Sequence, residues 1–429
     1  MISSGKRMAA QMRDLFPICR SISGDGVRET LRDIGSRIPL EIQEVASGTQ
    51  VLDWTVPDEW NIRDAYISAP DGERIVDFQS SNLHVMSYSE PVRAHMTLSE
   101  LRPHLFTHPE RADWIPYRTS YYERAWGFCL AEEVLDTLEH VEYEVVIDST
   151  LEPGSLTYGE CFIPGDDDDV VLLTTHVCHP SLANDNLSGI ALLTELAAQL
   201  VHTRHRLSYR LLFIPGTIGS LAWLAANRER LASVVAGIVV ACVGDPAPLT
   251  YKRTRRGTAL VDRAAAHVLE SGYRDARVVD FVPWGWDERQ FNSPGFDLPV
   301  GSLSRSREGE YAEYHSSADD LDLVQPEQLE ETLLALGAIL DVVERNRTFT
   351  NRIPHGEPQL GKRGLYPSTG GGLPDVERLA MLWLLNQSDG SKSVLDIALR
   401  AGISFDVLAG CAERLLEAEL LAVSEESRL

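Results

Sequence analysis

Residues 170–201 read VVLLTTHVCHPSLANDNLSGIALLTELAAQLV, and this stretch decides the fold class of the chain. It opens with a hydrophobic run of strand length, VVLLTTH. Residues 187–201 then repeat apolar side chains every three or four positions, which is typical of a helix. The loop between them holds His176, Cys178, His179 and Asp185. A buried strand followed by a polar loop and a helix is the repeating unit of an α/β protein.

The alternation of strands and helices continues from about residue 142 to residue 346. The segments YEVVIDS, LSYRLLFIP, GIVVACVGD and LPVGSLS predict further strands. Helices are predicted between them, and the long helix that closes the unit carries Pro326 in its first turn. Such alternation predicts a largely parallel sheet with helices on both faces. We assign residues 1–50 and 130–350 to this α/β domain.

The remaining regions have a different texture. Residues 51–129 are short, turn-broken segments rich in β-branched and aromatic residues, which predict a small inserted β-rich domain. Residues 351–374 are rich in glycine and proline and indicate a linker. Residues 375–429 contain three helical runs and a final strand, the pattern of a winged-helix-like domain. Residues 356–429 carry seven Lys and Arg against eleven Asp and Glu, so docking is favoured over DNA recognition.

Composition limits the classes of partner and compartment. The 429 residues carry a formal charge of −25, which argues against nucleic acid or an anionic membrane as a partner. The six cysteines are scattered without a CxxC pair, as expected for reduced thiols. The first residues lack a signal-peptide core, and no segment approaches 18 uncharged apolar residues. We therefore expect a cytoplasmic protein, with a homo-oligomer left open because the acidic C-terminal module could dock.

Carboxylates and imidazoles recur where the predicted strands end. The carboxyl ends of parallel strands meet at one edge of a sheet, where ligands bind in open α/β folds. The polar positions that follow strands are His176, Cys178, His179, Asp185, Thr217, Asp245, Asp287, Glu288, Glu308, Glu310, Glu313 and His315. Zinc takes imidazole nitrogen and carboxylate oxygen, and catalytic zinc keeps one position open for water. His176, Asp185, Asp245 and His315 could supply such a set.

Each of these residues also has a plainer interpretation. Asp185 could cap the following helix, Asp245 before a proline could be a turn residue, and a single strand-end histidine is often structural. Convergence on one edge of one sheet favours the metal site, with Cys178 and His179 in supporting or structural positions.

Several stretches distributed over nearly the whole chain resemble a known family. They are SISGDGVRETL, DWTVPDEWNIRDAYI, TSYYERAWGFCL, STLEPGSLTYGE, THVCHPSLANDNLSG, GWDERQFNSPGFDLPVGSLSR, EYAEYHSSADDLD and GKRGLYPSTGG. They resemble the zinc-dependent aminopeptidase clan. They look most like a bacterial branch with an aminopeptidase-like domain, an inserted domain of unknown function and a C-terminal winged helix. The resemblance implies a three-layer α/β/α sandwich.

The resemblance also implies roles for individual residues. A histidine after the first motif strand binds one metal ion in the clan, which points to His176, and the aspartate of NDN-SG bridges two, which points to Asp185. An aspartate ending a later strand completes the first metal, matching Asp245. A histidine in a YH-S/T segment binds the second, matching His315. Asp287 matches an aspartate of a later active-site loop, with a supporting role.

Two places depart from the clan's pattern. Cys178 stands where an aspartate orients the first histidine. Gly216 and Thr217 stand where the clan has a Glu-Glu pair, of which the first is the general base. A positioned base contributes about 10²–10⁴-fold in rate. The second glutamate of the pair is a ligand of the second metal in the clan, so Asp185 and His315 alone would leave that metal under-coordinated. We therefore expect one zinc ion rather than two, unless another carboxylate substitutes. Glu310 is the best placed candidate, because it lies near His315 on the same loop, and the other candidates are Glu313 and Glu288, with Asp287 next to Glu288 in a supporting role.

Three functions remain open from the sequence. The first is a zinc-dependent, aminopeptidase-like hydrolase that cleaves an amide or peptide bond of a small amine-bearing or peptide-like substrate. The second is an acyl transferase that forms or cyclises an amide on the same site, because loss of a base suppresses hydrolysis. The third is a non-catalytic binding or assembly protein that retains the fold.

Overall fold

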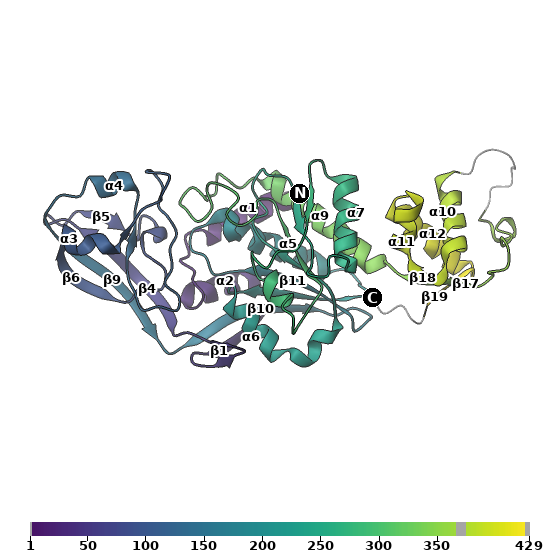
Figure 1. Ribbon diagram of the computed structural model, residues 1–429, viewed down its shortest axis with the longest axis horizontal. Helices are drawn as coiled ribbons and strands as arrows, with labels where there is room; N and C mark the ends of the chain where they lie inside the picture. Colours follow the sequence, from purple (N-terminus) through teal and green to yellow (C-terminus); the bar gives the residue numbers. More distant parts are fainter. Residues whose placement is uncertain (1, 366–374, 425–429) are drawn as a thin grey trace.

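The computed structural model describes residues 2–365 and 375–424, which form three units arranged along the longest axis (Figure 1). A large α/β unit lies in the middle. A small sheet formed by the inserted region lies at one end, and a three-helix unit formed by the C-terminal residues lies at the other. Residues 366–374, the second part of the predicted linker, lie outside the described residues.

The α/β unit is built on an eight-stranded mixed sheet. Its strand order is β1-β10-β12-β11-β13-β16-β14-β15. The strands are β1 (Glu41–Ala46), β10 (Ser155–Ile163), β11 (Val170–His176), β12 (Ser208–Ile214), β13 (Val234–Val240), β14 (Thr250–Lys252), β15 (Arg277–Val279) and β16 (Val300–Ser304). The central strands β12, β11, β13 and β16 are parallel, and β10 and β14 flank them antiparallel.

Helices cover both faces of this sheet. One face is covered by α1 (Ser4–Leu15), α2 (Asp25–Gly35), α5 (Gly189–Leu200), α7 (Leu260–Gly272) and α9 (Pro326–Arg345), and the other by α6 (Ile218–Ala226) and α8 (Glu288–Phe291). Strand β11 contributes to both layers: Leu173 packs with the first set, whereas Leu172 packs with Trp223 and Phe291. All of β11 is buried, as expected for a central parallel strand. The predicted α/β sandwich is confirmed.

The inserted region forms a separate antiparallel sheet in the order β5-β4-β9-β6. Its elements and their short neighbours are β2 (Gln50–Val51), β3 (Trp54–Thr55), β4 (Glu59–Ser68), β5 (Arg74–Asp77), β6 (Val92–Thr97), α3 (Leu98–Leu101), β7 (Leu105–Phe106), β8 (Phe128–Cys129), α4 (Glu132–Asp136) and β9 (Glu142–Glu152). We expected residues 143–149 in the α/β sheet, but β9 pairs with β4 and β6. Strands β9 and β10 carry the chain from the small sheet into the large one.

The C-terminal unit contains three helices and a three-stranded sheet. These are α10 (Val376–Gln387), α11 (Val394–Ala401) and α12 (Phe405–Glu417), with β17 (Thr348–Asn351), β18 (Asp389–Ser393) and β19 (Leu421–Val423). Ser393 and Asp396 form a capping box at the start of α11, and Gly402 ends it in the left-handed conformation. The exposed positions of α12 include Asp406, Glu413 and Glu417.

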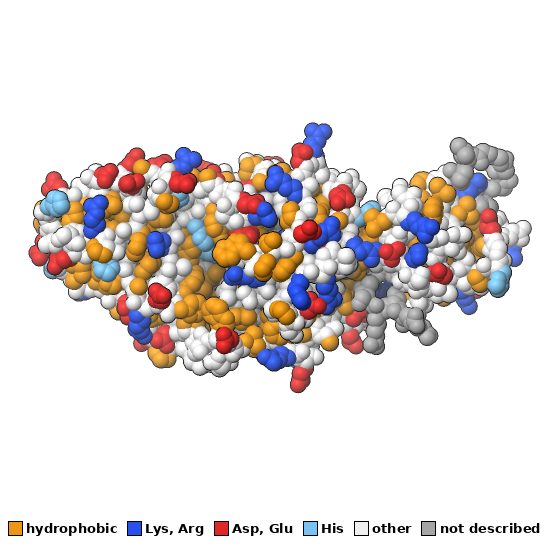
Figure 2. All heavy atoms as spheres, in the orientation of Figure 1, with side chains coloured by type: hydrophobic (Ala, Val, Ile, Leu, Met, Phe, Trp, Pro, Cys, Tyr) orange, Lys and Arg blue, Asp and Glu red, His pale blue; other side chains and the backbone are white. Residues whose placement is uncertain are grey.

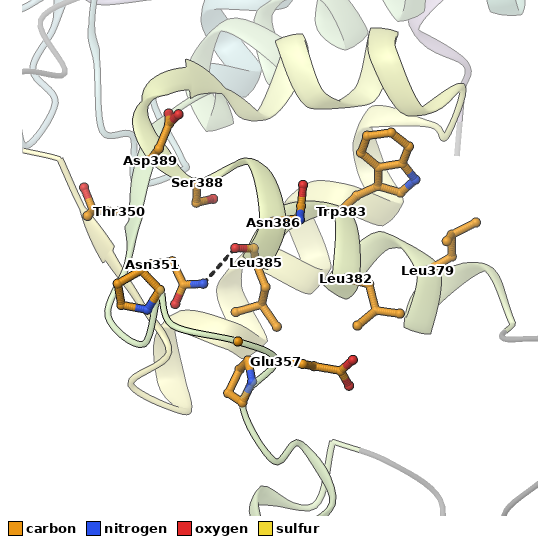
Figure 3. Close-up of a pocket in the computed structure, with 13 residues that line it drawn as sticks. Thr350, Asn351, Glu357, Leu379, Leu382, Trp383, Leu385, Asn386, Ser388 and Asp389 are labelled. Carbon is orange, nitrogen blue, oxygen red and sulfur yellow. Dashed lines mark hydrogen bonds between the residues drawn. The ribbon is translucent and has the colours of Figure 1, made fainter.

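A groove of about 920 Å³ runs along α10 of this unit (Figure 3). Leu379, Leu382 and Trp383 line one side, and Asn351 donates a hydrogen bond to the carbonyl of Leu385 at 2.7 Å. This groove lies in the C-terminal unit and is not lined by the polar residues at the edge of the large sheet. Cavity size alone therefore does not identify the polar cluster of that sheet. No helix among the described residues combines the length and the apolar character needed to cross a membrane.

An ion pair links the inserted sheet to the α/β unit. Both oxygens of Glu59, on β4, accept hydrogen bonds from the guanidinium of Arg28, on α2, at 2.8 and 2.5 Å. The same carboxylate accepts the backbone N–H of Ser155 at 2.8 Å, at the start of β10. The hydrogen bond from Arg28, opposed by partial burial, lowers the pKa of Glu59 to about 2. The carboxylate therefore joins three segments.

We expect Glu59→Gln to lower the free energy of unfolding at pH 7 by about 1–3 kcal/mol, because a hydrogen-bonded charge is lost. The folded pKa of Glu59 lies below its unfolded value, so this contribution is present above about pH 4.5 and is lost as the pH falls towards 2. Urea unfolding at several pH values measures it. Asp148→Asn, which breaks the exposed Arg63–Asp148 pair, is the control and should change stability by less than about 1 kcal/mol. Equal effects of the two substitutions would contradict the assignment.

Candidate functional site

The polar cluster lies at the carboxyl edge of the central strands. His176 is the last residue of β11. The loop after it leads into an irregular helical segment, Ala183–Ser188, in which Asp185 and Asn186 depart from helical dihedral angles and are joined by a cis peptide bond. Helix α5 begins directly afterwards. The loop therefore turns the side chain of Asp185 back towards the end of the strand that precedes it.

Three imidazoles surround the carboxylate of Asp185. Nε2 of His176 lies 2.7 Å from Oδ1 of Asp185, and Nε2 of His315 lies 3.1 Å from Oδ2. Nδ1 of His179 lies 4.0 Å from Oδ1. The structure thus brings together His176, Asp185 and His315, three residues predicted from the sequence, and adds His179. One ligand atom each from His176, His179 and Asp185 lie within 4.8 Å of one another.

Burial and charge prepare these groups for a cation. Asp185 is fully buried, which opposes ionisation, but the facing imidazoles of His179 and His176 hold its pKa well below the usual range. Burial lowers the pKa of His179 to about 3, so its imidazole is neutral. Nδ1 of His179 is buried and has no hydrogen-bond partner among the described residues. Neutral imidazole nitrogens and an ionised carboxylate are the ligands that zinc takes, so the residues present fit a zinc ion.

A second carboxylate fixes the loop that carries Asp185. Asp319 accepts the backbone N–H groups of Asn184 at 2.5 Å and Asp185 at 3.0 Å, and the hydroxyl of Tyr311 at 3.1 Å. Burial and the nearby charge of Asp185 raise the pKa of Asp319 to about 7. Groups behind the ligands orient them in metal sites, and Asp319 has that position here. Asp319 was not among the residues predicted from the sequence, although it lies four residues after His315.

Asp245, a predicted ligand, has a different environment from the imidazoles. Its Oδ1 accepts the backbone N–H of Ala247 at 2.8 Å and the hydroxyl of Ser306 at 2.9 Å. Its Oδ2 accepts the side-chain amide of Asn184 at 2.8 Å and the backbone N–H of Ser306 at 3.2 Å. The carboxylate thus joins the loops after β13 and β16 to the loop of Asp185.

The two departures from the clan's pattern lie side by side. The backbone N–H of Gly216 donates to Sγ of Cys178 at 3.3 Å. A Cβ atom built on Gly216 would lie 3.4 Å from that sulfur and 3.9 Å from Cβ of His176. Residue 216 therefore borders the cluster, and a Cβ atom at this position makes only ordinary van der Waals contacts. Burial raises the pKa of Cys178 to about 12, so this thiol remains protonated.

The three predicted catalytic carboxylates lie in different surroundings. Oδ1 of Asp287 accepts the backbone N–H of Thr217, the residue after Gly216, at 2.7 Å, and burial raises the pKa of this carboxyl. Glu288 is fully buried and pairs with Lys252. The side chain of Glu310 is 43% exposed and pairs with Arg307. Of the three, Asp287 borders the cluster.

Aromatic side chains also enclose the histidines. The ring of Tyr117 lies 5.2 Å from that of His179 and 5.0 Å from that of His315. The backbone N–H of Tyr117 donates to the carbonyl of His315 at 2.7 Å. Tyr314 stacks on His315 at 3.9 Å. Tyr117 belongs to the inserted region, so this region takes part in the site. The aromatic run DWIPYRTSYYERAWGF, residues 113–128, was the available signal in the sequence.

Comparison with known proteins gives relatives for the whole chain. The model of a family described as a domain of unknown function, DUF4910, matches residues 9–346, and a winged helix-turn-helix model matches residues 347–423. A Clostridium acetobutylicum protein named "putative polysaccharide biosynthesis protein with aminopeptidase-like domain" is 51% identical over 411 residues, which cover 96% of this chain and 94% of that protein. Winged-helix domains commonly bind DNA, so this match does not support the expected absence of nucleic acid as a partner.

Solved structures identify the fold. A putative peptidase from Clostridium acetobutylicum is similar with a TM-score of 0.92 and 49% identity, covering 98% of this chain and 96% of that one. A zinc aminopeptidase from Bacillus subtilis has a TM-score of 0.57 at 13% identity, with coverage of 78% and 94%, and supports the fold alone. The protein therefore has an aminopeptidase-like α/β fold followed by a winged helix, and it belongs to the family defined by the DUF4910 domain of unknown function.

Proposed function

We propose that the protein is a zinc-dependent hydrolase that cleaves an amide bond in an amine-bearing, sugar-linked substrate. The observation that carries the proposal is the buried carboxylate of Asp185 among three imidazoles, one of which, His179, has no hydrogen-bond partner for Nδ1 within the described part of the chain. The aminopeptidase-like fold and a relative named a putative peptidase support peptidase-like chemistry. The name of the 51% identical relative, which refers to polysaccharide biosynthesis, supports a sugar in the substrate.

The proposed zinc ligands are His176, Asp185, His315 and His179. His179 replaces the predicted Asp245, because both oxygens of Asp245 already accept two hydrogen bonds each. When bound, zinc polarises a carbonyl and makes water a usable nucleophile near neutral pH. The side chain of His315 is one-third exposed and marks the side from which a substrate enters.

Asp287 is the proposed general base. Its carboxylate accepts the N–H of Thr217, the residue that follows the glycine at the position of the missing glutamate. Burial raises the pKa of Asp287. In the proposed reaction Asp287 takes the proton that water loses as the oxygen attacks the amide carbon. It returns this proton to the amine that leaves when the carbon–nitrogen bond breaks.

Zinc binding tests the metal site directly. We expect the purified protein to bind one zinc ion per chain, measured by elemental analysis after dialysis and by titration calorimetry. His176→Ala should weaken binding by more than about 100-fold, because the loss of a ligand exceeds the 10–100-fold that the loss of a supporting group costs. His140→Ala, at an exposed histidine, is the control and should bind zinc normally. Equal zinc content in both variants would exclude the proposed ligands.

Two carboxylate substitutions distinguish the candidate bases. Asp287→Asn keeps an oxygen for the N–H of Thr217, so the fold and the zinc content should persist. We expect kcat for hydrolysis of an aminoacyl 4-nitroanilide to fall by about 10²–10⁴-fold. Glu310→Gln is the matched comparison and should change kcat by less than about twofold, because Glu310 pairs with Arg307 at the surface. The reverse result would transfer the role of base to Glu310.

The glycine at 216 favours a second function, an acyl transferase, because a base for water is missing there. Gly216→Glu tests which function holds. A Cβ at this position meets Sγ of Cys178 at 3.4 Å, so the side chain can be accommodated. We expect hydrolysis to rise about tenfold or more, with Gly216→Gln as the control of equal size. If hydrolysis does not rise, and the wild-type protein instead joins the acyl group to added hydroxylamine, the transferase is the correct function.

A further inference from the structure

A continuous series of aromatic rings leads from the histidine cluster to the surface of the inserted domain. Tyr117, in contact with His179 and His315, shares a hydrogen bond with Tyr121 between their hydroxyls at 2.6 Å. The rings of Tyr121 and Tyr122 lie 6.4 Å apart, and those of Tyr122 and Trp54 lie 5.3 Å apart in an edge-to-face arrangement. Trp54 and Tyr122 form the outer end of this series, and we call them the aromatic platform.

The aromatic platform lies on the Gly216 side of the cluster. Trp54 belongs to the hairpin of β2 and β3, and Val51 of this hairpin packs in one buried cluster with Ile218 and Ala222 of α6. Helix α6 begins two residues after Gly216. The hairpin that carries Trp54 is thus packed with the helix that follows Gly216.

Trp54 and Tyr122 are exposed to solvent, although large aromatic side chains stabilise a fold more when they are buried. Trp54 is 39% exposed and Tyr122 is 50% exposed. The exposed Phe162 differs, because the guanidinium of Arg210 covers its ring at 4.7 Å. Hydrophobic side chains gather where the inserted domain meets the α/β domain, with histidines among them (Figure 2). Exposed apolar groups that adjoin a polar site are typical of ligand-binding surfaces.

We propose that Trp54 and Tyr122 bind a pyranose ring of the substrate, so that its acylated amine extends towards Asp185. The inference rests on the proposed function and names the group that the inserted domain recognises. A pyranose has an apolar face of C–H groups and a rim of hydroxyls. A half-exposed platform suits such a ring, because the apolar face packs on the rings while the hydroxyls stay in water. Aromatic side chains provide this area at a small cost in conformational entropy.

Binding of simple sugars to the full chain tests the proposal without any hydrolysis. The probes are glucosamine, N-acetylglucosamine, N-acetylgalactosamine and N-acetylchitotriose, observed by saturation-transfer NMR with titration. We expect at least one to bind, and Trp54→Ala and Tyr122→Ala each to weaken that binding by about tenfold or more, a loss within the range of single-ring stacking contacts. Trp54→Phe should restore most of the affinity. Phe162→Ala, at an exposed aromatic residue of β10, should leave it unchanged.

The outcomes separate this inference from the proposed function. His176→Ala should lose zinc but keep the affinity for the sugar, because the platform does not contain a proposed ligand. Sugar binding that persists without hydrolysis by the wild-type protein would support the platform and overturn the hydrolase. If none of the four sugars binds, or if Trp54→Ala and Phe162→Ala bind equally well, the platform is overturned even where hydrolysis is found. Thermal unfolding confirms that each variant is folded, and both substituted side chains are exposed.

Discussion

The buried carboxylate of Asp185 is the group on which the arrangement of the site depends. An isolated buried anion is costly, so the structure must supply charge or donors around it. His176 and His315 contact its two oxygens from segments 130 residues apart or more, and Asp319 holds the backbone that carries it. The loops after β11 and β16 therefore cannot move independently. The same constraint that stabilises the anion keeps three imidazole nitrogens directed at one point.

The inserted domain is part of this constraint. The N–H of Tyr117 donates to the carbonyl of His315, and the N–H of Ser317 donates to the carbonyl of Ile115. These two backbone hydrogen bonds join the loop of His315, in the α/β domain, to Ile115 and Tyr117 of the inserted domain. The ion pair of Glu59 and Arg28 adds a second link between the same two domains. A shift of the small sheet would therefore displace His315 and change the geometry of the cluster.

Local sequence patterns predicted most of the fold and part of the site. The buried run before His176 and the helix after Asp185 carry their own periodicity, so the edge on which both residues lie could be inferred. The strands that pair with β9 could not be inferred, because the alternation of apolar and polar residues shows that a strand forms but does not show which sheet it joins. The roles of His179 and Asp245 also depend on contacts across space: the ring of His179 turns towards Asp185, whereas the oxygens of Asp245 are taken by Asn184 and two other residues.

The contact between Cys178 and Gly216 links two differences that look independent in the sequence. Each stands where the clan has a carboxylate, and together they remove two negative charges from one side of the cluster. Asp185 then remains as the anion in contact with the imidazoles, with Asp287 beside it. Two divalent ions a few ångströms apart repel each other strongly unless several anionic ligands separate them. The proposed site, with Asp185 as its one carboxylate ligand, is therefore better matched in charge to one zinc ion than to two.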